Sequence, residues 1–558
     1  MLCADTESVG AFPAQSSAEI LRTEMDLIRA SCLVVLLACA EFQGDGARIL
    51  GIFPSPSFSH QLVFQTIMKA LSARGHHVTV ISTDPLKEPI GNYTDVDLSF
   101  MYDYVRGKLN FSDCQGITAF GTVLRFSLHV GIVCNMQLGS PAIQDFIRCH
   151  PSTNTSFDLV FMEMSRYQCY YGLIHHVGSP PVIGIRSVGT TSATLAAVGS
   201  PNNPAYFPDY YLPYTGHMTF FQRLHNTAIY VWNSVLWHAL LMPMNEVAMR
   251  YHFGRGPPSV WEAEKNVSLV MVNSHWSQSY PLPLLPAVIQ LGNIHIQEKP
   301  KQLPQDLQEF LDGAAKGAVY FSLGSNVRSE TMSPEKRRVF LSAFADVPQR
   351  VLWKWEANDT SDVPDNVKLA KWLPQQDVLA HPNVRLFITQ GGLQSFQEAT
   401  YYAVPLIGIP FIADQQHNVR KMVDAGVGLQ LDYATLSKDG LVTATRKVLH
   451  DPTFRENMLK FSTVAKDRPD KPLDSAVWWA EYVLRHNGAR HLRSAALDLT
   501  WYQYFLLDVM ATALFVLLLA SYLTYVIVRW TFHRLVGRCS SAARHDVNEN
   551  CVVAKKFD

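Results

Sequence analysis

Residues 372–415 constrain the fold of this chain more than any other stretch, because short apolar runs alternate there with tight polar turns. Residues 384–389 are an apolar run of strand length, and Gln390-Gly391-Gly392 follows as a turn. Residues 393–403 have the pattern of a helix, and residues 404–409 form a second apolar strand. Strand, glycine turn, helix and strand in this order are typical of an open α/β sheet.

The polar residues of this segment fall where the predicted strands end. Ligands of open α/β sheets bind beyond the carboxyl ends of the strands. Glycines ahead of a helix let the backbone approach a phosphate, and the first-turn N–H groups and the helix dipole favour negative charge. Gln394 and Glu398 are four residues apart and share one helix face. The segment therefore predicts a site for a phosphate-bearing ligand.

The whole segment resembles the signature of the UDP-glycosyltransferases, and its TQGGLQS run is similar to the insect and baculoviral members. The resemblance covers about residue 48 to the C-terminus, in the membrane-anchored animal form of the family. It implies the GT-B fold, in which two Rossmann-like α/β domains face a cleft. It also implies transfer of a sugar from a UDP-sugar to small lipophilic acceptors, with the UDP-sugar as a co-substrate and no cofactor or metal.

The resemblance assigns a donor role to nine residues. It implies that Trp372 stacks on uracil, Gln375 contacts the uridine, Gln394 and Ser395 bind phosphates, Glu398 holds the ribose hydroxyls, and Asp414 and Gln415 hold the sugar. Ser325, in a Gly-Ser turn after a predicted strand, resembles the phosphate-contacting loop. Gln390 departs from the pattern, because most members have a phosphate-binding histidine there. An amide can donate a hydrogen bond but cannot carry charge.

Two residues of the first half match the catalytic pair of the family. His60 follows the first predicted strand at a loop-to-helix junction and matches the catalytic base. Glu163 follows another predicted strand and matches the carboxylate that orients the base, where many members have Asp. A histidine near a helix start is more often a cap or a surface residue, and Glu163 could be a solvated loop carboxylate. The resemblance is what favours the catalytic interpretation.

We expect two large domains. Residues 43–286 would form the N-terminal acceptor-binding Rossmann-like domain, opening with strands at 48–53 and 77–82 around a helix. Residues 287–500 would form the C-terminal UDP-sugar-binding domain. The proline-rich residues 280–286 would be the linker between them. Residues 476–494 have helical periodicity and are expected to pack back across the domains.

A membrane anchor is expected near the C-terminus. Residues 507–528 are predicted to be a transmembrane helix, because 509–528 contain no charged side chain and, at about 1.5 Å per residue, reach about 30 Å. Arginines follow it, so residues 529–558 are predicted to be a cytosolic tail. Residues 25–42 resemble a signal peptide, and residues 1–24 are an unassigned extension, with translation starting at Met1 or Met25.

These features predict a type I protein of the endoplasmic reticulum membrane, with lumenal catalytic domains and a Lys555-Lys556-Phe557-Asp558 retrieval signal on the tail. Four clustered cysteines in an oxidising compartment allow two disulfides in three pairings, or stay as buried thiols. They are Cys114, Cys134, Cys149 and Cys169. Five asparagines, Asn92, Asn110, Asn154, Asn266 and Asn358, begin N-glycosylation sequons.

The resemblance implies an inverting, metal-independent hexosyltransferase that uses UDP-glucose, with a role in detoxification. UDP-glucuronic acid as donor, or a non-catalytic UDP-sugar-binding partner subunit, are the alternatives. A homo-oligomer is compatible with the sequence.

A NAD enzyme is disfavoured, since no G-x-G-x-x-G follows the first strand. Asp95-Val96-Asp97 resembles a metal-binding DxD, but we interpret it as a solvated loop. The net charge of −1 gives no excess of basic residues of the kind that indicates nucleic-acid binding.

Overall fold

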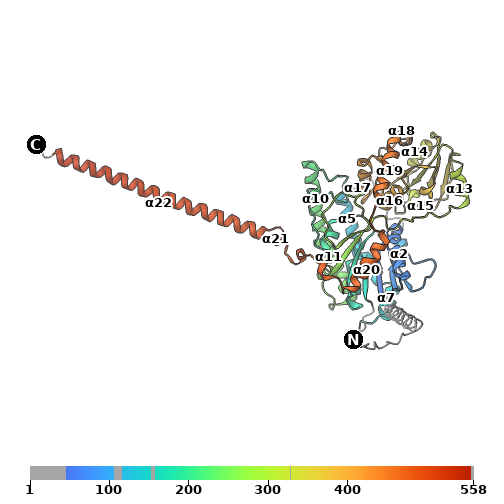
Figure 1. The fold of residues 1–558 in the computed structure, drawn as a ribbon, viewed down its shortest axis with the longest axis horizontal. Helices are drawn as coiled ribbons and strands as arrows, with labels where there is room; N and C mark the ends of the chain where they lie inside the picture. Colours follow the sequence, from blue (N-terminus) through green and yellow to red (C-terminus); the bar gives the residue numbers. More distant parts are fainter. Residues whose placement is uncertain (1–45, 106–115, 153–156, 327, 555–558) are drawn as a thin grey trace, which may run out of the picture. The chain divides into compact units, whose positions relative to one another are not determined.

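A computed structural model describes residues 46–105, 116–152, 157–326 and 328–554, with side chains described as far as residue 541. The expected extension, signal peptide and retrieval signal lie outside the described residues. The chain divides into two compact units, Met1–Arg493 and Ser494–Asp558. The first unit contains two parallel sheets with helices around them, and the second contains a long apolar helix (Figure 1).

The first sheet has seven parallel strands in the order β3-β2-β1-β4-β5-β6-β7. This is the order of a Rossmann fold, with the switch point between β1 and β4. The strands are β1 (Arg48–Phe53), β2 (His77–Ser82), β3 (Tyr93–Asp97), β4 (Leu159–Glu163), β5 (Val182–Arg186), β6 (Val267–Val272) and β7 (Val288–Gln290). Strands β1, β4 and β6 are apolar runs, as expected for strands that helices cover on both faces.

The second sheet has six parallel strands in the order β10-β9-β8-β11-β12-β13, again a Rossmann arrangement. Its strands are β8 (Ala318–Ser322), β9 (Arg350–Lys354), β10 (Val367–Ala370), β11 (Val384–Thr389), β12 (Leu406–Gly408) and β13 (Gly428–Gln430). One apolar core lies on each face of this sheet. Trp353 is fully buried in one of them, among Phe321, Phe340 and Phe344.

Helices and short helical turns complete the first unit. In the N-terminal half these are α2 (Phe58–Ala73), α3 (Met101–Val105), α5 (Ala119–Leu128), α6 (Val130–Leu138), α7 (Pro141–Cys149), the turn η1 (Gln168–Tyr170), α8 (Tyr171–His176), α9 (Ser192–Ala197), α10 (Phe220–Leu236), the π-helical turn η2 (Trp237–Leu241), α11 (Met242–Phe253) and α12 (Val260–Glu264). In the C-terminal half they are α13 (Gln305–Asp312), the turn η3 (Ser329–Thr331), α14 (Pro334–Ala345), α15 (Gln375–Ala380), α16 (Leu393–Tyr401), α17 (Gln415–Asp424), α18 (Lys438–His450), α19 (Pro452–Lys466), α20 (Pro472–Arg485) and the turn η4 (Arg490–Leu492).

The boundary between the two domains differs from the expectation. Strand β7 follows the proline-rich residues 280–286, yet it pairs with β6 in the first sheet, so the N-terminal domain continues beyond residue 286. Helix α20 crosses back as predicted: it packs on α2, and Ala476 and Ala480 are buried in the core of the first domain. Figure 1 shows α20 beside α2. The helix itself spans Pro472–Arg485 rather than 476–494.

The interpretation of Asp95 and Asp97 as a solvated loop is wrong. Both residues lie on the edge strand β3, which pairs with β2. The Asp95 carboxylate accepts a hydrogen bond from the Leu86 backbone N–H at 3.1 Å, and burial raises the pKa of Asp95. Asp95 therefore fixes a loop beside the sheet.

The second unit contains the predicted membrane helix. It consists of the turn η5 (Ala495–Asp498), α21 (Trp501–Tyr504) and α22 (Leu507–Ala554). Residues Leu507–Ser541 are long and apolar enough to cross a membrane, and none of that window is buried in protein. The helix continues beyond the expected end at residue 528, because nothing in residues 529–554 breaks a helix: they contain no proline and only one glycine, Gly537.

Candidate active site

A cavity of about 1330 Å³ opens where the carboxyl ends of the two sheets face each other. Loops that follow β1, β4 and β5 form one wall, and loops that follow β8, β11 and β12 form the other. The structure brings together on these walls every residue that the sequence predicted: His60, Glu163, Ser325, Trp372, Gln375, Gln390, Gln394, Ser395, Glu398, Asp414 and Gln415.

His60 and Glu163 meet on the N-terminal wall. His60 lies in the first turn of α2, and Glu163 is the last residue of β4. Nδ1 of His60 lies 3.5 Å from Oε1 of Glu163, and this nitrogen is buried without a hydrogen-bond partner among the described residues. A separation of this size is longer than an ordinary hydrogen bond, and catalytic hydrogen bonds of unliganded enzymes commonly tighten when substrate binds. With Nδ1 turned to the carboxylate, Nε2 is the nitrogen left for a substrate.

Ser55 fixes the carboxylate of this pair. Its hydroxyl donates to Oε1 of Glu163 at 2.6 Å, and its backbone N–H donates to Oε2 at 3.2 Å. The loop that carries Ser55 is held by Gln61, whose amide donates to the carbonyl oxygens of Phe53 and Ser55 at 2.8 Å. Glu163 is therefore buried and oriented before any ligand arrives.

Glu398 is the centre of a hydrogen-bond network on the C-terminal wall. Gln375 donates to one carboxylate oxygen at 2.6 Å, and Gln376 donates to the other at 3.3 Å. Nε2 of the buried His295 also lies 3.2 Å from Oε1 of Glu398. Gln375 in turn donates to the hydroxyl of Ser395 at 2.9 Å. The carboxylate is thus held rigidly at the cavity wall.

The first turn of α16 is open to the cavity. Gly392 is its N-cap and supplies no side-chain cap, so the first-turn N–H groups are left for a ligand. Gly391 and Gly324 both have φ of +82°, and a Cβ at Gly324 would lie 2.3 Å from Nε2 of Gln390. Gln390 therefore occupies the space that the missing side chain of Gly324 leaves, beside Ser325.

Trp372 is the most exposed of the predicted donor residues, at 56%. Its ring packs edge-on against Phe58 of the opposite wall, with centroids 4.8 Å apart. Nζ of Lys354 lies 5.6 Å from the Trp372 centroid, and it donates to the Gly324 carbonyl oxygen while pairing with Glu356. An exposed indole face held at its edges is suited to stacking on a planar base.

Asp414 and Gln415 begin α17. Burial raises the pKa of the Asp414 carboxyl, while the hydrogen bond from Asn418 at 2.8 Å and the nearby His60 act in the opposite direction. Asn418 also donates to the carbonyl oxygen of Gly391, which ties this carboxyl to the glycine turn. The side-chain oxygen of Gln415 accepts the backbone N–H groups of Phe411 and Ile412.

Gln394 connects the two domains. Its amide donates to the carbonyl oxygen of Ser187, which follows β5 in the first sheet, at 2.8 Å. The same carbonyl accepts from Asn273 at 3.0 Å, and Gln397 donates to the Asn273 carbonyl oxygen. A phosphate contact by Gln394 therefore requires this interdomain hydrogen bond to be exchanged or shared.

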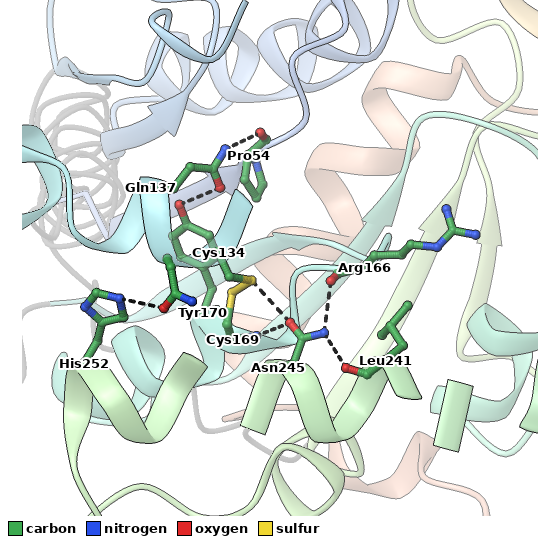
Figure 2. The surroundings of a disulfide bond; sticks show 10 residues. Pro54, Cys134, Gln137, Arg166, Cys169, Tyr170, Leu241, Asn245 and His252 are labelled. Atoms are coloured by element: carbon green, nitrogen blue, oxygen red, sulfur yellow. Dashed lines mark hydrogen bonds between the residues drawn. A yellow bond between two sulfur atoms is a disulfide. The ribbon is translucent and has the colours of Figure 1, made fainter. Parts of the chain in front are cut away.

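A disulfide braces the N-terminal wall from behind. It joins Cys134 of α6 to Cys169 of η1 (Figure 2). Asn245 of α11 accepts from the Cys169 N–H and donates to the Arg166 carbonyl oxygen, and Gln137 donates to Pro54, directly before Ser55. The expectation of two disulfides is wrong for Cys149, which is a free, exposed thiol, and Cys114 lies outside the described residues.

The sequence did not indicate several residues that position the predicted site residues. Ser55, Gln376 and His295 position the predicted carboxylates, and Arg186 ends β5 inside the cavity. Ser55 could have been found, because it lies in the strand-end loop directly before the helix that carries His60. His295 could not, since it lies in an irregular segment before β8 and its partner Glu398 is about a hundred residues away.

The comparisons with known proteins agree with this geometry. The profile of the family described as "UDP-glucoronosyl and UDP-glucosyl transferase" matches residues 127–541. The chain is 36% identical to "UDP-glucosyltransferase 2" of Dactylopius coccus over 86% of this chain and 92% of that protein. It is 32% identical to "UDP-glucuronosyltransferase 2B7" of Homo sapiens over 90% of this chain and 97% of that protein.

Solved structures agree in fold. The chain is similar to the glycosyltransferase VinC, crystallised with DTDP, with a TM-score of 0.52, 16% identity, and coverage of 79% of this chain and 100% of that one. The forosaminyltransferase SpnP gives a TM-score of 0.51 at 19% identity, covering 79% of this chain and 99% of that one. At these identities the likeness concerns the GT-B fold alone. From the family profile and the curated relatives, the chain belongs to the UDP-glucuronosyl and UDP-glucosyl transferase family, and it is a glycosyltransferase that uses a UDP-sugar donor.

Proposed function

We propose that the enzyme transfers glucose from UDP-glucose to a hydroxyl of small lipophilic acceptors, with inversion at the anomeric carbon and without a metal. One observation carries the proposal: His60 pairs with Glu163 on one wall of the cavity, and the Glu398 network lies on the other wall. A histidine beside a fixed carboxylate is suited to general-base catalysis. Intact residues on both walls argue against a non-catalytic binding subunit.

In this mechanism Nε2 of His60 takes the proton of the acceptor hydroxyl, and Glu163 stabilises the imidazolium that forms. The acceptor oxygen attacks the anomeric carbon as the bond to the UDP oxygen breaks on the opposite face. The leaving diphosphate gathers negative charge, which the first turn of α16, Gln390 and Ser325 are placed to stabilise. Phe126, Val130 and Val133 give the N-terminal wall the apolar surface that a lipophilic acceptor needs.

Glucose as the donated sugar is supported by the 36% identity to an insect glucosyltransferase. One observation favours the second candidate, UDP-glucuronic acid. Arg186 lines the cavity, its charge acts on Asp414, and its Nε is buried without a hydrogen-bond partner among the described residues. A guanidinium in that place would suit the carboxylate of a glucuronic acid.

Parallel incubations with a phenol and each of the two UDP-sugars test the proposal. We expect UDP release and a β-glucoside of the phenol with UDP-glucose, with the anomeric configuration read by NMR. Preferred use of UDP-glucuronic acid, lost selectively in Arg186→Gln, would establish the second candidate. UDP binding without turnover of either donor would instead support the non-catalytic subunit.

We also propose that the enzyme is a type I protein of the endoplasmic reticulum membrane with a lumenal catalytic unit. The candidate span at Leu507–Ser541, the disulfide and the exposed sequon residues Asn92, Asn266 and Asn358 support this topology. Protease applied to intact microsomes should trim only residues after Arg529, and glycosidase should shift the mass. Loss of the catalytic unit under the same treatment would reverse the proposed orientation.

A further inference from the structure

Arg166 brings a positive charge to the N-terminal wall of the cavity. Its guanidinium donates a hydrogen bond to the hydroxyl oxygen of Tyr211 at 2.9 Å and lies 5.5 Å from the ring centroid of Phe126. In the part of the chain that the structure describes, no carboxylate lies within ion-pair distance of it. A guanidinium has five N–H donors and stays charged, so most of these donors are open to a ligand.

Two cations on the C-terminal wall of the same cavity have carboxylate partners. Lys354 pairs with Glu356 at 2.6 Å, and Arg328 pairs with Glu330 at 2.7 Å. Proteins rarely take a cation out of water without a counter-charge, because its desolvation is costly. Arg166 is half-buried. The contrast with the two paired cations indicates that the anion for Arg166 comes from a ligand.

The protein holds Arg166 at both ends. Its carbonyl oxygen accepts from Asn245 at 3.2 Å, and Asn245 also accepts the N–H of Cys169, whose disulfide braces this wall. Figure 2 shows the Arg166 side chain pointing away from the disulfide. At the guanidinium end, Tyr211 is fixed in turn, since its backbone N–H donates to the buried Asp209 at 3.0 Å. A guanidinium that is placed in advance loses little side-chain entropy when it binds a ligand.

The cavity around Arg166 is otherwise apolar on the side of α5 and α6. Phe126, Val130 and Val133 line it there. Arg166 follows Glu163 of the catalytic pair by three residues, so their α-carbons are at most about 11 Å apart. A flat apolar molecule with an anionic group at one end and a hydroxyl at the other would fit between the guanidinium and the catalytic pair.

The donor is a poor source for this anion. Its diphosphate is expected at the first turn of α16 and at Ser325, both on the C-terminal wall. Arg186 is the arginine whose charge acts on Asp414, on the side of the donor sugar. The contacts of Arg166, in contrast, are all with residues of the N-terminal domain. The anionic group therefore belongs to the acceptor.

We propose that the acceptor is an aromatic molecule with a carboxylate as well as the reacting hydroxyl, and that Arg166 binds the carboxylate through parallel hydrogen bonds. The inference rests on the proposed function, because it names the class of acceptor whose hydroxyl takes the sugar. The hydroxyl proton passes to Nε2 of His60, the hydroxyl oxygen bonds to the anomeric carbon, and the bond from that carbon to UDP breaks. The carboxylate stays ionised on Arg166 throughout, so Arg166 determines specificity and takes no part in the proton transfer.

Two pairs of acceptors that differ only at the acid test the proposal: para-hydroxybenzoate and para-hydroxycinnamate, each beside its methyl ester. The full-length enzyme is assayed for kcat/KM with UDP-glucose, and for acceptor affinity by calorimetry in the presence of UDP. We expect wild type to prefer at least one acid to its ester by about tenfold in both measurements, since the contact is charge-assisted and bidentate. Arg166→Gln should remove this preference by weakening the acid, while values for the esters stay within a few-fold of wild type.

Arg328→Gln is the matched control, because it removes a cavity arginine that already has a carboxylate partner. It should keep the preference for the acid. Arg166→Lys should keep part of the preference, since the charge remains and the fork is lost, and it replaces Arg166→Gln if that variant misfolds.

Three results would overturn the proposal. They are esters used or bound as well as both acids by wild type, a tenfold loss of UDP affinity in Arg166→Gln, and a sugar attached to the carboxylate in the product. The first of these, with turnover of the esters, would leave the proposed function intact. Tighter binding of an acid through Arg166, without turnover of any of the four compounds, would support the acid site and contradict the proposed function.

Discussion

The two walls of the active-site cavity are built in different ways. On the C-terminal wall, Glu398 is held by Gln375 and Gln376 and lies beside His295, so its place is set by the protein alone. On the N-terminal wall, Ser55 holds Glu163, but Nδ1 of His60 lies 3.5 Å from it and makes no hydrogen bond to any residue that the structure describes. The Glu398 network is complete without ligand, whereas the catalytic pair has one interaction still to make.

This difference indicates how the reaction is organised. A rigid donor wall lowers the cost of ordering side chains around the UDP-sugar. His60 would approach its carboxylate more closely as it takes up a proton. The contact between them is then stronger in the transition state than in the ground state, and an interaction of this kind accelerates the reaction. Changes on the two walls should therefore appear in different kinetic constants: kcat on the N-terminal wall and the donor KM on the C-terminal wall.

The largest effect is expected at His60. His60→Ala removes the general base, and such a loss typically costs about 10²–10⁴ in rate. We expect kcat with a phenol acceptor at saturating donor to fall by that factor, while UDP binding measured by calorimetry stays close to wild type. A His60→Ala enzyme within a few-fold of wild-type kcat would remove the assignment of the base and the proposed contrast between the walls.

The next effect is expected at Glu398. Glu398→Ala removes a charged acceptor for the ribose, and a lost charge-assisted hydrogen bond of about 1.5–3 kcal/mol corresponds to a rise of about 10- to 100-fold in the donor KM. His295→Gln should raise the same constant less, because Gln375 and Gln376 still hold the carboxylate. Glu330→Ala, another carboxylate of the same cavity, is the matched control and should leave the donor KM near wild type. A fall in kcat without a change in KM would place Glu398 outside the donor site.

The same contrast explains what could be predicted from the sequence. The donor wall comes mainly from residues 372–415, where strand, turn and helix follow directly along the chain, and the predicted strand 384–389 coincides with β11. All nine predicted donor residues line the cavity, and eight of them belong to this segment, with Ser325 as the exception. The first sheet opens as predicted too, since β1 and β2 have the expected bounds.

The acceptor wall could not be predicted in the same way. Its residues come from loops after β1, β4 and β5 and from α5 and α6, and only the folded chain brings them together. Helices α5 and α6 read as one apolar run, and their division at His129 is set by packing against α10 and α11. Strand β7 follows a proline-rich loop and has only Val288–Gln290, too few residues to give a pattern. The resemblance implies a phosphate contact for Gln394, whereas its hydrogen bond to the Ser187 carbonyl oxygen forms only because the two domains meet.

A smaller effect on kcat is expected at Glu163. Glu163→Gln keeps an oxygen for the Ser55 hydroxyl but loses the charge that stabilises the imidazolium, so kcat should fall about tenfold. The kcat of wild type and variant with a phenol acceptor at saturating donor measures this. An unchanged kcat would mean that Glu163 only shapes the loop.

The smallest effect concerns stability behind the acceptor wall. Burial raises the pKa of Glu264 to about 7, although Gln168 donates to its carboxylate at 3.1 Å. The folded protein then binds this proton more tightly than the unfolded chain, so the contribution of Glu264 to stability is largest below about pH 4.5 and falls as the pH rises through 7. Glu264→Gln mimics the protonated form. Its unfolding temperature should therefore match wild type near pH 5 and exceed it by about 2 °C near pH 8. Glu309→Gln, on the exposed face of α13, should show no such difference. An equal shift at both pH values would mean that Glu264 is already ionised in the folded protein. The acceptor domain would then contain a buried negative charge behind its wall of the cavity.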